Sequence, residues 1–167
     1  MAQRQPLIPT SAVPWLATGG ALAALCIAWI AQYGFGLGPC ELCYWQRYCY
    51  WAAIALGVIA ILQPAGTARR KVAVTLLGAA FLATAGVALF HVGVEQKWWQ
   101  GLATCTGQIT PGMTPEELQN AIQNAPIVRC DEPAWTMFGI SMAGYNVAYA
   151  LLLTLFTLGG ALRSRAA

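Results

Sequence analysis

Charged residues are scarce in this sequence. Lys, Arg, Asp and Glu make up 9% of the 167 residues, whereas a soluble domain carries about 25%. With 58% hydrophobic residues and a mean hydropathy of +0.56, the chain is too apolar for a soluble domain. It also lacks any basic run longer than three residues, so its net charge of +3 does not indicate a nucleic-acid partner. We therefore expect an integral protein of the lipid bilayer.

Four segments are long enough to span a membrane and almost free of charge, at residues 13–33, 43–63, 72–92 and 136–162. The fold predicted for the single domain 1–167 is an all-α membrane protein, a bundle of four transmembrane helices. Orientation follows from the cations, because Lys and Arg gather on the cytoplasmic side. Six of the nine precede the first span, separate the second from the third or follow the fourth. Both termini are therefore expected in the cytoplasm.

The expected outer, periplasmic loops are residues 34–42 and 93–135. All six acidic residues and four of the six cysteines fall at this outer end. The second loop is far longer than the 2–8 residues that join neighbouring helices, which is typical of a loop with a function. Inside it, Thr114-Pro115-Glu116-Glu117 has the pattern of a helix N-cap, an N1 proline and a capping box. The loop is thus predicted to carry a short amphipathic helix.

A Cys-x-x-Cys pair, Cys40 and Cys43, stands at the head of the second span. At helical spacing their sulfurs lie within reach of a disulfide. Arg47 follows one turn deeper on the face of Cys43, where an arginine at membrane depth predicts a functional partner. That partner is either a Cys43 thiolate or an oxygen-bearing ligand in the bilayer. The alternative is an arginine that extends back to the lipid headgroups.

Cys105 and Cys130 flank the predicted amphipathic helix, and a disulfide between them would close a loop of about 26 residues. Taken alone, the pair fits a structural disulfide. Beside a Cys-x-x-Cys it also fits thiol–disulfide exchange, which needs a second pair within reach of the first. A Cys₄ zinc site, in a membrane metal-binding or transport protein, is a further alternative. Covalent haem attachment is excluded because Tyr44, not histidine, follows the second cysteine of the motif.

In its combined pattern the sequence resembles the DsbB family, the quinone-linked thiol oxidoreductases of the bacterial inner membrane. The resemblance covers nearly the whole chain and includes the layout of four spans with both termini inside. Its motifs are Cys40-x-x-Cys43-x-x-x-Arg47, His91 at the outer end of the third span, and the Cys105/Cys130 pair in the loop before the fourth. The vitamin K epoxide reductase group is a rival, but there the loop pair precedes the Cys-x-x-Cys motif.

The resemblance implies a disulfide-generating enzyme that reoxidises DsbA, the periplasmic dithiol oxidase. Reduced DsbA would attack Cys105, and Cys130 would pass toward Cys40. The electrons would then reach the membrane quinone pool, ubiquinone or menaquinone, through Cys43. Arg47 would stabilise the Cys43 thiolate and the quinone oxygen, with His91 close by as a further quinone-site residue.

Overall fold

The computed structural model describes residues 9–102, 112–123 and 128–163, which form an all-α bundle. Its four long elements are α1 (Val13–Trp29), continued by the π-helical turn η1 (Ile30–Gly34), α2 (Glu41–Leu62), α3 (Ala68–Glu95) and α6 (Met142–Arg163). Each is long and apolar enough to cross a membrane, counting η1 with α1. The predicted four-helix membrane fold is therefore confirmed.

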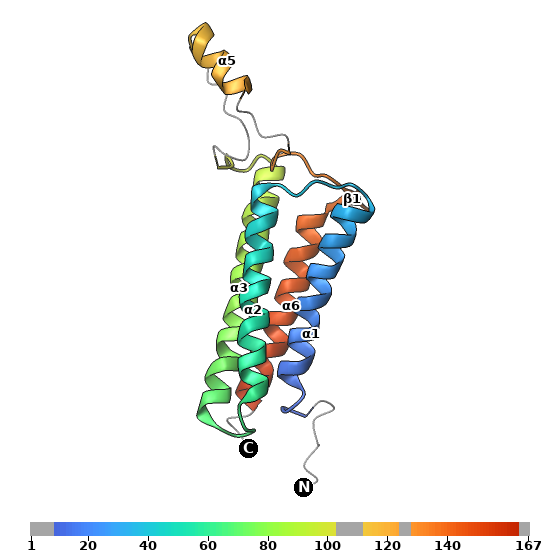
Figure 1. Ribbon diagram of the computed structural model, residues 1–167, viewed down its shortest axis with the longest axis vertical. Coiled ribbons are helices and arrows are strands. Elements are labelled where there is room, and N and C mark those ends of the chain that lie inside the picture. The colour runs from blue at the N-terminus through green and yellow to red at the C-terminus, as the bar shows by residue number, and fades with distance from the viewer. Residues whose placement is uncertain (1–8, 103–111, 124–127, 164–167) are drawn as a thin grey trace.

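The helices run alternately up and down, so the start of α1, the α2–α3 turn and the end of α6 share one end of the bundle (Figure 1). Helix α3 packs along both α2 and α6, whereas α1 lies mainly against α2 and touches α6 less. The central core consists of small and large apolar residues from all four helices, including Ala21, Leu25, Leu77 and Phe81. The redox motif lies at the opposite end, where α2 begins.

A two-stranded hairpin precedes the last helix. Strands β1 (Thr136–Met137) and β2 (Ile140–Ser141) pair antiparallel, and the turn residues Phe138 and Gly139 have φ angles of 51° and 77°. Two consecutive positive φ values fit a type I′ turn, which suits a two-residue hairpin. The sequence placed the start of a span at residue 136, but helix α6 begins at Met142 because the chain first reverses in this turn.

Helix α5 (Pro115–Gln123) stands apart from the bundle (Figure 1). Its N-terminus is capped reciprocally: the Thr114 N–H donates to Glu117 Oε2 at 2.8 Å, and the Glu117 N–H donates to Thr114 Oγ1 at 3.3 Å. These two bonds satisfy amide groups that a helix leaves free at its first turn. The capping box and the short helix predicted from the sequence are confirmed.

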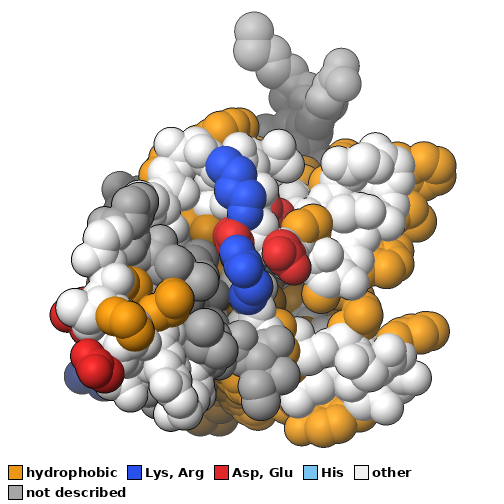
Figure 2. Space-filling view, turned by 90° about the horizontal axis from the view of Figure 1, so that it is seen from above, with side chains coloured by type: hydrophobic (Ala, Val, Ile, Leu, Met, Phe, Trp, Pro, Cys, Tyr) orange, Lys and Arg blue, Asp and Glu red, His pale blue; other side chains and the backbone are white. Residues whose placement is uncertain are grey.

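An ion cluster fixes the segment before the hairpin to the end of α3. Lys97 Nζ lies 2.5 Å and Arg129 Nη2 2.7 Å from Asp131 Oδ2. The Arg129 hydrogen bonds, together with Lys97, hold the pKa of the Asp131 carboxyl well below its usual range. The cluster appears as alternating blue and red side chains across the outer face in Figure 2. It anchors the backbone one residue after Cys130.

Candidate active site

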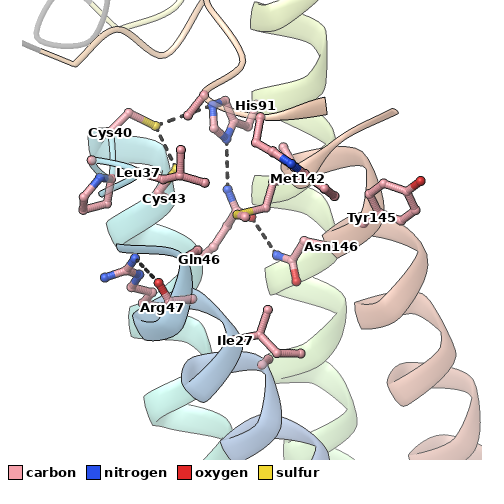
Figure 3. A pocket seen from close by; sticks show the side chains of 18 of the residues that line it. Ile27, Leu37, Cys40, Cys43, Gln46, Arg47, His91, Met142, Tyr145 and Asn146 are labelled. Atoms are coloured by element: carbon pink, nitrogen blue, oxygen red, sulfur yellow. Dashed lines mark hydrogen bonds between the residues drawn. The ribbon is translucent and has the colours of Figure 1, made fainter. Parts of the chain in front are cut away.

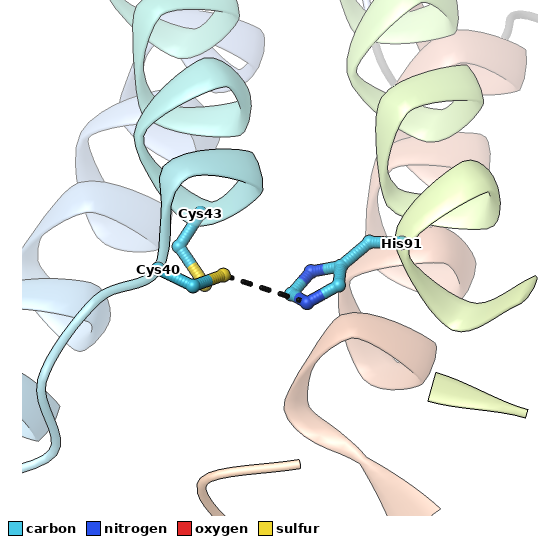
Figure 4. A group of neighbouring side chains, drawn as sticks. All are labelled: Cys40, Cys43 and His91. Atoms are coloured by element: carbon cyan, nitrogen blue, oxygen red, sulfur yellow. Dashed lines mark hydrogen bonds between the residues drawn. The ribbon is translucent and has the colours of Figure 1, made fainter. Parts of the chain in front are cut away.

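The Cys-x-x-Cys pair occupies the first turn of α2. Cys40 is the N-cap residue, with extended backbone angles, and Cys43 is the third residue of the helix. Both are free thiols, and their sulfurs lie 3.0 Å apart (Figure 4). A disulfide requires about 2.05 Å, so a shift of about 1 Å joins them. This geometry allows a disulfide between Cys40 and Cys43 to form without rearrangement of the helix.

The two sulfurs are not equivalent. The hydrogen bond with Cys43, together with burial, raises the pKa of the Cys40 thiol well above its ordinary value. The Cys43 sulfur also lies at the positive end of the α2 dipole, a position that suits a nucleophilic sulfur.

The structure packs Cys130 against the Cys-x-x-Cys pair. Cys130 is fully buried in a cluster with Cys40, Leu42 and Val94, and Cys43 borders the same cluster. Cys130 takes part in a disulfide. Cys105, the other cysteine predicted for this loop, lies outside the described residues. One cysteine of the second predicted pair is therefore next to the first pair.

His91 approaches the sulfurs from α3. Its side chain is buried, and Nε2 lies 3.5 Å from Cys40 Sγ (Figure 4) and 3.7 Å from Glu95 Oε1. The Glu95 side chain is also buried and accepts a hydrogen bond from Ser141, the last residue of β2. The ligand atoms of Cys40, Cys43 and His91 lie within 4.8 Å of one another. Proximity alone thus leaves the metal-binding alternative open.

Arg47 is held by helix α1. Its Nη1 donates to Gln32 Oε1 at 2.6 Å and its Nη2 to the Ala28 carbonyl at 3.2 Å, and the guanidinium lies 5.5 Å from the Tyr44 ring centroid. The sequence predicted a Cys43 thiolate or a bilayer ligand as its partner. In the structure its two hydrogen-bonded groups belong to α1 and η1, and Arg47 and Cys43 line one cavity, so the predicted partner stays a prediction.

That cavity has a volume of about 350 Å³ and lies between α1, α2, α3, α6 and the segment around residue 130. Cys40, Cys43, Arg47 and His91 all contribute to its wall (Figure 3). The wall between them is largely apolar, with Ala24, Ile27, Ala28, Ala31 and Met142 among its residues. Its volume falls in the range of about 300–1,000 Å³ that is usual for small-molecule sites.

Three polar residues of the cavity wall were not predicted. Gln46, Asn146 and Tyr50 form a chain of hydrogen bonds that leads from His91 into the bundle (Figure 3 labels the first two). The sequence did contain a signal, because Cys43, Gln46 and Tyr50 recur at helical spacing in an otherwise apolar span. Polar side chains within a membrane span are costly unless they have hydrogen-bond partners, so their presence there indicates a functional site.

Comparisons with known proteins agree on one family. Residues 10–159 match the family model described as disulfide bond formation protein DsbB. The "Disulfide bond formation protein B" of Neisseria meningitidis serogroup A is 30% identical, over 84% of this chain and 88% of its own length. The protein of that name from Haemophilus influenzae is 29% identical, over 80% and 78%. "Uncharacterized protein RP370" of Rickettsia prowazekii is 30% identical, over 81% and 78%. No solved structure matches the chain significantly.

Proposed function

Because the chain belongs to the DsbB family of disulfide bond formation proteins, we propose that it reoxidises a periplasmic DsbA-type dithiol oxidase and reduces a membrane quinone. The family assignment makes it a membrane protein of disulfide formation. The observation that carries the finer proposal is the shared cavity, where a Cys-x-x-Cys pair 3.0 Å apart faces an apolar pocket of about 350 Å³.

The two cysteine pairs would work in series. The reduced partner attacks Cys105 and leaves with its own disulfide, so Cys105 and Cys130 become thiols. The Cys130 sulfur then attacks Cys40, and the second pair is oxidised again while Cys40 and Cys43 become a dithiol. The burial of Cys130 in one cluster with Cys40 supports this exchange, because a mixed disulfide needs direct contact between the sulfurs.

The residues of the cavity fit a quinone headgroup. Apolar side chains suit its planar ring, and the Arg47 guanidinium presents donors to an oxygen on the side of Cys43. When bound, a quinone supplies the two-electron acceptor that restores the Cys40–Cys43 disulfide. DsbA has a potential of about −120 mV, so an acceptor more oxidising than the glutathione pool is required. Either ubiquinone or menaquinone meets that chemical requirement.

The test is quinone reduction by purified protein supplied with a reduced DsbA-type protein. We expect loss of quinone absorbance in step with oxidation of the partner, and no reduction by Cys43→Ser. Cys26→Ser is the matched control, because Cys26 is a free cysteine exposed on α1 and does not line the cavity. It should retain full activity.

Two results would contradict the proposal. One is an absence of turnover with both ubiquinone and menaquinone when the partner is fully reduced. The other is stoichiometric zinc or copper in purified protein that carries no quinone, which would favour the metal-binding alternative. Extraction of the bound lipid would identify which quinone the protein uses.

A further inference from the structure

The orientation of one buried amide determines where His91 carries its hydrogen. Gln46 Nε2 lies 3.1 Å from the Leu42 carbonyl and also 3.1 Å from His91 Nδ1. A carbonyl oxygen can only accept, so the Gln46 atom facing Leu42 must be the nitrogen. Its two hydrogens then point to the Leu42 carbonyl and to Nδ1. Nδ1 therefore accepts a hydrogen bond and carries no hydrogen in the neutral ring.

The next residues in the chain agree with this direction. Asn146 Nδ2 donates to Gln46 Oε1 at 2.6 Å, and the Tyr50 hydroxyl donates to Asn146 Oδ1 at 2.6 Å. Every amide oxygen in the chain accepts and every amide nitrogen donates. Hydrogen bonds aligned in this way polarise and reinforce one another in a medium of low dielectric constant.

The other ring nitrogen, Nε2, lies 3.5 Å from Cys40 Sγ and 3.7 Å from Glu95 Oε1. A sulfur and an ionised carboxylate oxygen can both accept a hydrogen bond. The surroundings of Nε2 thus agree with the tautomer that Gln46 indicates, with the hydrogen on Nε2.

We propose that Gln46 and Asn146 are positioning residues that hold the His91 hydrogen on Nε2, where it is donated toward Cys40. His91 then acts as a hydrogen-bond donor to sulfur and not as the acceptor of a thiol proton. The effect of this tautomer on turnover rests on the proposed function. When the Cys40–Cys43 disulfide forms, two S–H bonds break, one S–S bond forms, and the electron pair and both protons pass to the quinone, giving a quinol.

This assignment also bears on the metal alternative. A histidine binds a metal through a nitrogen that carries no hydrogen, and its other nitrogen usually donates to an oxygen. Here the nitrogen beside the sulfurs carries the hydrogen, and the other faces an amide N–H. The arrangement around His91 is thus the reverse of a metal-binding one.

The test uses the fact that His91 is the only histidine of the chain. Protein labelled with ¹⁵N-histidine and reconstituted in nanodiscs gives the ring nitrogen shifts of this one residue by NMR, without partner or quinone. For the wild type we expect Nε2 protonated and Nδ1 unprotonated. Gln46→Glu places an acceptor-only carboxylate against Nδ1, so the hydrogen should appear on Nδ1.

A second variant acts from one residue further away. Asn146→Asp places a carboxylate against Gln46 Oε1 in place of a donor. The Gln46 amide nitrogen should turn toward this carboxylate and give up its bonds to the Leu42 carbonyl and Nδ1, so hydrogen should also move to Nδ1. Gln63→Leu is the control, because Gln63 lies at the opposite end of α2 and should leave the ring shifts unchanged. A wild-type ring protonated at Nδ1, or a Gln46→Glu ring that keeps its hydrogen on Nε2 alone, would overturn the proposal.

Activity measurements give a second readout. Loss of a hydrogen bond to sulfur should slow quinone reduction by Gln46→Glu roughly 10- to 100-fold, while Gln63→Leu keeps the wild-type rate. A Gln46→Glu enzyme with a switched tautomer and an unchanged rate would overturn the catalytic part of the inference. If the wild type itself reduces no quinone, the proposed function fails, and the NMR result on the tautomer still stands.

Discussion

Arg47 shows how one charge is accommodated at the edge of a membrane site. Two of its nitrogens donate hydrogen bonds, one to the Gln32 side chain of η1 and one to the Ala28 carbonyl of α1, so the guanidinium is fixed in the cavity wall. A side chain fixed by another helix loses little further freedom when it binds a ligand, which favours affinity. These contacts weigh against an arginine that merely extends to the headgroups.

We predict that Arg47→Ala raises the apparent KM for quinone by about tenfold or more, because a charged hydrogen bond to the ligand is lost. Arg47→Lys should restore only part of the affinity, since an ammonium lacks the planar forked geometry. Arg70→Lys is the control. Arg70, like Arg47, donates two hydrogen bonds, but to two backbone carbonyls at the other end of the bundle. An Arg47→Lys enzyme with a wild-type KM would remove Arg47 from the binding site.

At the scale of elements, helices α1 and α2 approach each other closely. A Cβ atom added to Gly57 would lie 2.0 Å from Thr18 Oγ1, so only glycine permits this contact. Thr18 cannot easily move away, because its hydroxyl donates to the Pro14 carbonyl at 2.6 Å. The two helices therefore touch at Gly57 and Thr18, which do not line the cavity.

Gly57→Ala should destabilise the bundle by about 1–3 kcal/mol, as overpacking of a close contact does. The measurement is thermal unfolding in detergent, where we expect a lower midpoint. Gly86→Ala in α3 is the matched control, since a Cβ there would meet no atom within 4 Å. Equal midpoints for the two variants would show that the α1–α2 contact does not depend on Gly57.

Local signals in the sequence predicted some elements and missed others for a physical reason. The capping box joins Thr114 and Glu117, which are three residues apart, so its pattern can be recognised in the sequence. The Gln46–Asn146 hydrogen bond joins residues 100 positions apart, and nothing local to either reveals the partner. The residues of the hairpin around Phe138 are mostly apolar, so the sequence predicts a membrane span there and not a turn.

Over the whole molecule, the charges divide between the two ends of the bundle. Among the described residues, four cations lie at the end that holds the α2–α3 turn: Arg69, Arg70, Lys71 and Arg163. At the other end Lys97 and Arg129 both pair with Asp131, so their charge is largely neutralised. Apart from Arg47, the described cations without an acidic partner thus lie at one end, which is the side expected to remain in the cytoplasm.

This distribution predicts that the cysteine pairs face the periplasm, and single cysteines in a background without native cysteines test it. Ala65→Cys in the α2–α3 turn and Glu116→Cys in α5 are both at exposed positions, and they lie beyond opposite ends of the helix bundle (Figure 1). A membrane-impermeant maleimide applied to the periplasmic face should label Glu116→Cys at once and Ala65→Cys only after the membrane is opened. Labelling in the reverse order would place Cys40 and Cys43 on the cytoplasmic side, where reducing thiol pools would oppose a disulfide-forming role.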